Sequence, residues 1–145
     1  MLHEGAVTSR IPAQDLQRAR RFYADKLGLE PSEERAGGLL YRCASGEFAL
    51  FESAGTATGA FTQMAWQVDD IEAVVRALRA RGVRFEDYDM PGLTTIDGIA
   101  TIEGNYPSKG TGERAAWFRD SEGNLLAIGQ AIDRNVHAHN PIPDP

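Results

Sequence analysis

Between residues 69 and 82 the apolar positions recur at the spacing of a helix. They fall at i, i+3, i+4 and i+7, at Ile71, Val74, Val75 and Leu78. Four apolar side chains therefore share one helix face. Asp69, with Glu72 three residues later, predicts a capping box at the amino end, and Gly82 predicts the left-handed residue at which the helix ends.

An earlier segment has the same helix start and stop signals, because Asp15 precedes it and Gly28 follows it. Its apolar positions are Leu16, Ala19, Phe22, Tyr23 and Leu27. Aligning Asp15 with Asp70 offsets the two segments by 55 residues. The sequence therefore predicts two helices at corresponding positions of the two halves of the chain.

Extended segments surround both helices in the same order. In the first half we predict strands over 7–12, 39–43 and 47–52, and in the second half over 62–68, 114–119 and 124–130. The pattern predicts an α+β fold built by internal duplication of a βαβββ unit.

The second half carries one additional segment. Asp97-Gly98 predicts a two-residue hairpin turn between 94–96 and 99–102. The glycine-rich stretch 103–113 follows, and both a lid and a simple connecting loop remain open for it.

Composition predicts one globular domain. The 145 residues are 42% apolar and 25% charged, so a core can form without disulfides, and the single Cys43 reads as a small buried hydrophobe. The domain is expected over 1–135, with an extended tail over 136–145 whose His137 and His139 could hold a metal only weakly. A net charge of −6 argues against a nucleic-acid partner. Without an apolar leader or a run of about 20 apolar residues, we expect a cytoplasmic protein with no membrane partner.

Several short motifs carry a resemblance to a known family. They are Asp15-Leu16, Phe22-Tyr23, Leu27-Gly28, Val68-Asp69-Asp70-Ile71, Gly82-Val83 and Phe118-Arg119-Asp120-Ser121-Glu122-Gly123-Asn124. In this order they resemble the vicinal oxygen chelate superfamily, the group of glyoxalases, bleomycin-resistance proteins and extradiol dioxygenases. The resemblance implies two modules, 6–54 and 61–132, that form a half-closed mixed barrel with the ligand on its concave face.

The resemblance also implies where a metal would bind. Carried onto this chain, the four ligand positions of the family's enzymes fall at Thr8, Ala49, Gln63 and Ala127. Only Gln63 could coordinate strongly, whereas a divalent ion needs several converging donors. We therefore expect no metal and no cofactor. A three-residue error of register, which would turn Glu52 inward, stays open.

Hairpin geometry helps to set the register of the strands. A three-residue loop over 121–123 would place Asp120 opposite Asn124 and pair Trp117 with Ala127. A similar loop over 44–46 would place Tyr41 opposite Ala49.

Strand alternation then predicts the residues that line the concave face. The candidate ligand-binding residues are Thr8, Arg10, Tyr41, Glu47, Phe51, Gln63, Gln67 and Trp117. This mixture suits a small aromatic or cationic ligand, because rings stack on aromatic walls while polar groups fix orientation. Arg10 could instead pair with Glu47, and both readings stay open.

Three functions follow from these predictions. The leading one is a metal-free homodimer that binds a small molecule and sequesters an antibiotic or related metabolite. The second is a metal-dependent lyase, isomerase or dioxygenase that takes ligands from Gln63, Glu52 and Glu47. The third is a metal-free enzyme with Glu47 or Glu52 as base and Arg10 stabilising an oxyanion. We expect the dimer because a second copy can cover the open sheet edges.

Overall fold

The computed structural model describes residues 1–103 and 112–132, and it divides them into two compact units. Unit 1 contains residues 1–64 and 119–125, and unit 2 contains residues 65–118 and 126–132. The first unit therefore includes a short piece from the second half of the chain. Most of the stretch predicted as a lid or loop, and the tail with its two histidines, lie outside the described residues.

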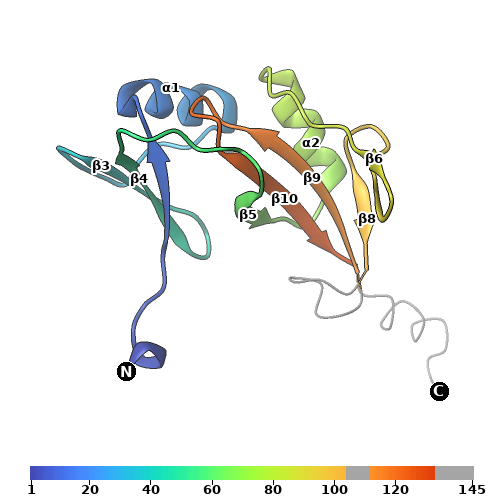
Figure 1. Ribbon diagram of the computed structural model, residues 1–145, viewed down its shortest axis with the longest axis horizontal. Coiled ribbons are helices and arrows are strands. Elements are labelled where there is room, and N and C mark those ends of the chain that lie inside the picture. Colours follow the sequence, from blue (N-terminus) through green and yellow to red (C-terminus); the bar gives the residue numbers. More distant parts are fainter. Residues whose placement is uncertain (104–111, 133–145) are drawn as a thin grey trace. The chain divides into compact units, whose positions relative to one another are not determined.

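Unit 1 contains one helix and a four-stranded mixed sheet (Figure 1). A short 3-10 turn, η1 (Leu2–Glu4), precedes its elements, which are β1 (Ser9–Ala13), α1 (Leu16–Leu27), β2 (Glu33–Arg35), β3 (Gly38–Arg42) and β4 (Glu47–Glu52). The strand order is β1-β4-β3-β2, with β1 parallel to β4 and the other neighbours antiparallel. This is the predicted βαβββ arrangement.

The second four-stranded sheet has the order β5-β10-β9-β8, and a two-stranded sheet pairs β6 with β7. The elements are β5 (Thr62–Gln67), α2 (Ile71–Ala80), β6 (Asp89–Met90), β7 (Leu93–Thr94), β8 (Ala100–Ile102), β9 (Glu113–Arg119) and β10 (Leu125–Ala131). The predicted α+β class with two βαβββ modules is confirmed, and neither four-stranded sheet closes on itself.

The helix ends follow from local chemistry. Asp15 caps α1 by accepting from the Arg18 backbone N–H at 2.9 Å, and the helix ends at Gly28 with φ of 72°. In α2 the cap is Asp70, which accepts from the Ala73 N–H at 3.1 Å. The prediction that Asp69 caps this helix was therefore wrong by one residue, although the 55-residue offset between the caps holds.

The predicted hairpin turn at Asp97-Gly98 is confirmed. Ile96 and Ile99 exchange backbone hydrogen bonds of 2.9 and 3.1 Å across it. Asp97 and Gly98 have φ of 55° and 81°, the left-handed pair that such a two-residue turn requires.

The core of unit 1 lies between α1 and one face of its sheet. Ile11, Leu39, Leu50 and Phe48 are buried on this face, and Tyr23 of the helix reaches them. Phe48 and Tyr23 have ring centroids 5.9 Å apart, which is typical of packed aromatic pairs.

Tyr41 belongs to this core and not to the concave face. It pairs with Phe48, and their rings stack with centroids 4.9 Å apart. The hairpin closes with Cys43 N–H donating to the Gly46 carbonyl, so only two residues form the turn where three were predicted. Because a one-residue slip turns every side chain to the other face, Leu40 takes the predicted place opposite Ala49.

In the described part of the chain, neither helix is long and apolar enough to span a membrane.

Candidate ligand-binding faces

A hollow of about 490 Å³ lies on the face of the unit 1 sheet that points away from α1. Its lining is Arg10, Glu33, Arg35, Gly37, Gly38, Leu39, Leu40, Ala49, Leu50 and Phe51. Its volume falls within the range of about 300–1,000 Å³ that is usual for small-molecule sites. Arg10, Ala49 and Phe51 were predicted for this face, whereas Gly38 and Leu40 were missed because of the wrong hairpin turn.

Arg10 and Phe51 form the wall of this hollow. The Arg10 guanidinium carbon lies 4.7 Å from the centre of the Phe51 ring, a cation–π contact. Arg10 pairs in register with Ala49, whose methyl group leaves the floor open between them. Glu52 pairs with Ala13 and lies three residues after Ala49 on β4, so its side chain points to the face opposite that of Ala49. The alternative register that would turn Glu52 inward is therefore excluded.

Acidic and basic side chains form a chain of ion pairs on the same sheet. Arg42 reaches Glu47 at 3.1 Å and Glu33 at 3.0 Å. Each of these three side chains is between 38% and 50% exposed, so the pairs are screened by water. The suggested structural pair between Arg10 and Glu47 is not formed. Glu47 forms its ion pair with Arg42, and the Arg10 guanidinium packs on the ring of Phe51.

The remaining predicted residues are spread over other elements. Thr8 is exposed just before β1, Gln63 is half-buried on β5, and Gln67 is exposed at the end of that strand. Trp117 is half-buried on β9, and its ring meets Tyr88 edge to face with centroids 5.5 Å apart. That all these residues line one cavity with the unit 1 hollow stays a prediction.

The two faces of β9 differ in chemistry. Arg114 pairs with Glu72 of α2 at 2.8 Å, and Phe118 lies against Trp66 with centroids 6.3 Å apart. Residues of the other parity, Glu113, Ala115 and Trp117, therefore point away from α2. They form the face of unit 2 that carries the predicted Trp117.

Glu113 on this face was missed from the sequence. Its residue is only 6% exposed, and burial raises the pKa of its carboxyl. A Cβ added to Gly129 of β10 would lie 2.6 Å from Glu113 Oε2, so this carboxylate rests directly on the glycine. Its even spacing from Trp117 along one strand was the signal that could have found it.

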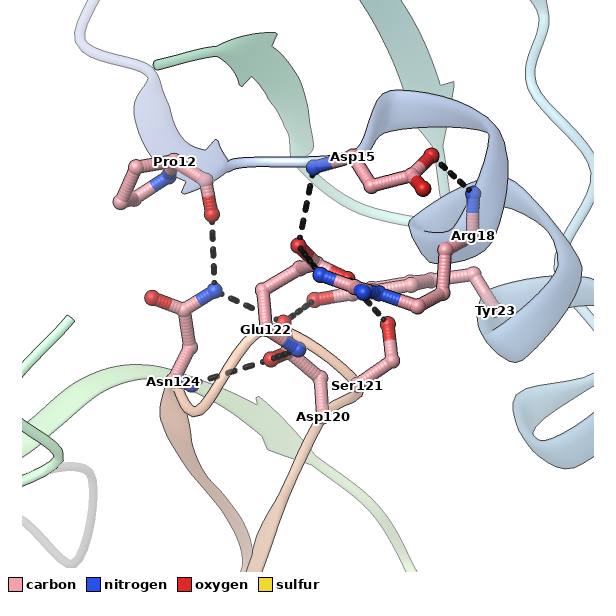
Figure 2. A network of polar contacts seen from close by, with 8 residues as sticks. All are labelled: Pro12, Asp15, Arg18, Tyr23, Asp120, Ser121, Glu122 and Asn124. Atoms are coloured by element: carbon pink, nitrogen blue, oxygen red, sulfur yellow. Dashed lines mark hydrogen bonds and ion pairs between the residues drawn. The ribbon is translucent and has the colours of Figure 1, made fainter. Parts of the chain in front are cut away.

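A polar network in unit 1 holds the β9–β10 turn against the start of α1 (Figure 2). Tyr23 donates to Asp120 Oδ2 at 2.8 Å, and burial beside this carboxylate raises the pKa of the tyrosine well above its usual value. Asn124 donates to the same Asp120 oxygen at 2.8 Å and to the Pro12 carbonyl at 3.0 Å. The predicted three-residue turn is confirmed, since Asp120 N–H donates to the Asn124 carbonyl at 3.0 Å.

Glu122 forms the second half of this network (Figure 2). Arg18 donates to both of its carboxylate oxygens, at 2.8 and 2.9 Å, and the Asp15 N–H donates to Oε1 at 3.1 Å. The bidentate Arg18 guanidinium lowers the pKa of Glu122 to about 2. The donors and carboxylates of these contacts are engaged within the protein, so the network fixes the backbone, whereas the buried Oδ1 of Asn124 has no hydrogen-bond partner among the described residues.

The residues at the predicted metal positions do not fit a metal centre. Two of the four positions are the alanines 49 and 127, which have no donor atom, and the others are a threonine and a glutamine. Within residues 1–103 and 112–132, no cluster of three or more His, Cys, Asp or Glu side chains could hold an ion.

Comparison with known proteins places these faces in context. The family model for the Glyoxalase/Bleomycin resistance protein/Dioxygenase superfamily matches residues 6–128. No curated protein matches the sequence.

Solved structures share the fold at low sequence identity. A glyoxalase/bleomycin resistance protein/dioxygenase from Alicyclobacillus acidocaldarius has a TM-score of 0.67 and 15% identity, over 90% of this chain and 94% of that one. The bleomycin resistance determinant encoded on the transposon Tn5 has a TM-score of 0.60 and 19% identity, over 88% and 98%. A genomically encoded fosfomycin resistance protein from Listeria monocytogenes has a TM-score of 0.61 and 12% identity, over 90% and 95%.

Proposed function

The chain belongs to the Glyoxalase/Bleomycin resistance protein/Dioxygenase superfamily, and we propose that within it this protein binds a small planar molecule without a metal ion. Its role would be to sequester an antibiotic or a related metabolite. The observation that carries the proposal is the hollow of unit 1, where the Arg10–Phe51 cation–π contact lies beside Ala49. The resemblance to the family implies a metal-binding carboxylate at the position of Ala49, and alanine has no donor atom.

The chemistry of this hollow suits recognition. An aromatic ring can stack on Phe51, while the Arg10 guanidinium offers N–H donors to a carbonyl or other acceptor on the ring. Ala49 and Leu40 supply apolar surface, and Gly38 lets a ligand approach the backbone closely. This mixture can orient a ligand, and the one carboxylate in the lining, Glu33, is paired with Arg35 and Arg42.

The test is binding in the presence of a chelator. Metal-free bleomycin and a panel of uncharged bicyclic and tricyclic dyes are titrated into the protein by calorimetry, with and without EDTA. We expect at least one compound to bind with the same affinity in both buffers. Arg10→Ala and Phe51→Ala should each weaken that affinity about tenfold, since one stacked or cation–π contact contributes about 1 kcal/mol or more.

Arg21→Ala is the matched control for these variants. Arg21 is an exposed arginine of α1 in the same unit and is absent from the lining of the hollow. Binding that disappears with EDTA, or that Arg10→Ala and Phe51→Ala leave unchanged, would overturn the proposal.

We further propose that the protein is a cytoplasmic homodimer. Val7 lies two residues before the edge strand β1, and Phe61 lies immediately before the edge strand β5; they are 94% and 67% exposed. A partner copy that covers these apolar side chains would remove them from water. A light-scattering mass of one chain at micromolar concentration would overturn this part.

A further inference from the structure

A second hollow, of about 510 Å³, lies within unit 2 between α2 and the hairpin that leads into β8 (Figure 1). Its lining is Glu72, Val75, Arg76, Arg79, Ile96, Asp97, Ile99, Thr101 and Arg114. The hairpin is the additional segment of the second half of the chain, and the proposed function makes no use of it. A volume of this size is usual for small-molecule sites.

The three arginines of this hollow differ in their partners. Arg114 pairs with Glu72 at 2.8 Å, so these two charges offset each other. Within residues 1–103 and 112–132, Arg76 and Arg79 form no ion pair with a carboxylate. Both lie on α2 three residues apart, which places them on the same side of the helix. The hollow therefore holds two neighbouring guanidinium charges that the described residues leave unpaired.

Neutral groups hold one of these two guanidiniums in place. Arg79 Nη2 donates to the Asp97 carbonyl at 2.9 Å, and the guanidinium carbon lies 5.5 Å from the centre of the Phe85 ring. A Cβ added to Gly98 would lie 2.9 Å from Nη2, so the glycine lets the hairpin turn lie close to the guanidinium. The side chain is thus positioned without losing its charge, and N–H donors remain for a ligand.

Apolar side chains form another part of the lining. Val75 is buried beneath the hollow and Ile99 is partly buried. Ile96, beside the tip of the hairpin, is 76% exposed. A ligand with an apolar group next to its charge would cover the isoleucine surface while its charge lies at the arginines.

We propose that this hollow binds the phosphate group of a small phosphate ester, with Arg76 and Arg79 as the phosphate ligands and Ile96 and Ile99 as the surface for its apolar part. A phosphate oxyanion matches the paired N–H donors of guanidinium groups, and its double charge suits two of them. The inference is independent of the proposed function, because every residue of this hollow belongs to unit 2.

Cyclohexyl phosphate is the probe for the test, with cyclohexanol and inorganic phosphate as comparisons. Its ring is not planar, so it does not suit stacking on Phe51 in the hollow of unit 1. Binding to the full chain is followed in ¹H–¹⁵N NMR spectra, which also locate it. We expect the backbone amides of residues 96–99 to shift. The ester should bind at least about tenfold more tightly than cyclohexanol and about threefold more tightly than inorganic phosphate.

Two substitutions that change charge should move the affinity for cyclohexyl phosphate in opposite directions. Arg76→Gln should weaken it about fivefold, since an exposed guanidinium is partly screened by water. Asp97→Asn should strengthen it about twofold to threefold, because a carboxylate in the lining repels the anion. Asparagine before glycine is favoured in a two-residue turn, so this second variant keeps the hairpin.

Arg79→Gln should weaken binding about as much as Arg76→Gln, but it also removes the contacts with the hairpin. Thermal unfolding of Arg79→Gln therefore accompanies its titration. Arg84→Gln is the matched control, because Arg84 is an exposed arginine of the same unit outside the lining, and its loss should leave the affinity unchanged.

Three results would overturn the inference. They are equal affinity for the ester and cyclohexanol, amide shifts that lie away from α2 and the hairpin, and an affinity that neither Arg76→Gln nor Asp97→Asn alters. Each would leave the proposed function standing, because that function is tested with planar compounds and with Arg10→Ala and Phe51→Ala in unit 1. Failure of those compounds to bind would likewise leave the phosphate site standing.

Discussion

Replacing Glu122 by glutamine tests whether the charge of this carboxylate holds the β9–β10 turn to α1. The change keeps the shape of the side chain and an oxygen that can still accept from the Asp15 N–H. It removes the negative charge that receives two hydrogen bonds from Arg18. We therefore expect a loss of folding stability that depends on pH.

The magnitude follows from the pKa of the carboxyl group. A pKa of about 2 in the folded protein, against an ordinary value of 4.5, corresponds by linkage to about 3 kcal/mol of stability at neutral pH. Arg18 keeps 48% of its side chain exposed, although Glu122 keeps only 2%, so solvent screening reduces the effect. We expect Glu122→Gln to cost about 1–2 kcal/mol at pH 7.

The sign of the pH dependence is fixed by the lowered pKa. The stabilisation is fully present above pH 4.5, and it is lost as the pH falls from 4.5 toward 2, where the folded carboxyl takes up a proton. Urea unfolding of the parent and of Glu122→Gln between pH 2.5 and 7 measures the difference directly. It should shrink steadily below pH 4.5, while Glu52→Gln, an exposed control, should show no such change. A difference that stays constant across this range, or is absent at pH 7, would refute the reasoning.

Three other predictions concern the core, the helix cap and metals. Tyr23→Phe removes the buried donor to Asp120 and should lower the free energy of unfolding by about 1–3 kcal/mol in urea, and an unchanged midpoint would contradict the network. Asp70→Ala should cost about 1 kcal/mol in thermal unfolding, whereas Asp69→Ala should cost little, and equal effects would mean that the cap is misassigned. Equilibrium dialysis against zinc, nickel and manganese should show no stoichiometric uptake at micromolar free metal, and one tightly held ion per chain would restore the metal-dependent alternative.

Local signals predicted most of the fold. The caps at Asp15 and Asp70 repeat because each has a side-chain oxygen one position before an apolar helical run, and this requirement is visible in the sequence. The error at Asp69 arose because two neighbouring aspartates satisfy the same pattern. Only the backbone conformation selects between them.

The candidate site was predicted less well because it depends on distant pairing. The hairpin between β3 and β4 closes with a two-residue turn, and nothing in Ala44-Ser45-Gly46 distinguishes that from a three-residue turn. The choice moved Tyr41 into the core and Leu40 into the hollow. Glu113 was missed for another reason, because the sequence placed it at the end of the glycine-rich stretch 103–113, whereas β9 begins at Glu113.

The turn over residues 119–125 belongs to unit 1 although it is encoded in the second half of the chain. Until the second half of the chain has been synthesised, Arg18 and Tyr23 therefore lack their partners. These partners, Glu122 and Asp120, lie 104 and 97 positions later in the sequence. Unit 1 can be completed only late in synthesis, and contacts of such long range slow folding. Expressing the duplicated halves as separate polypeptides should consequently fail to give an independently stable first half, in spite of the internal repeat.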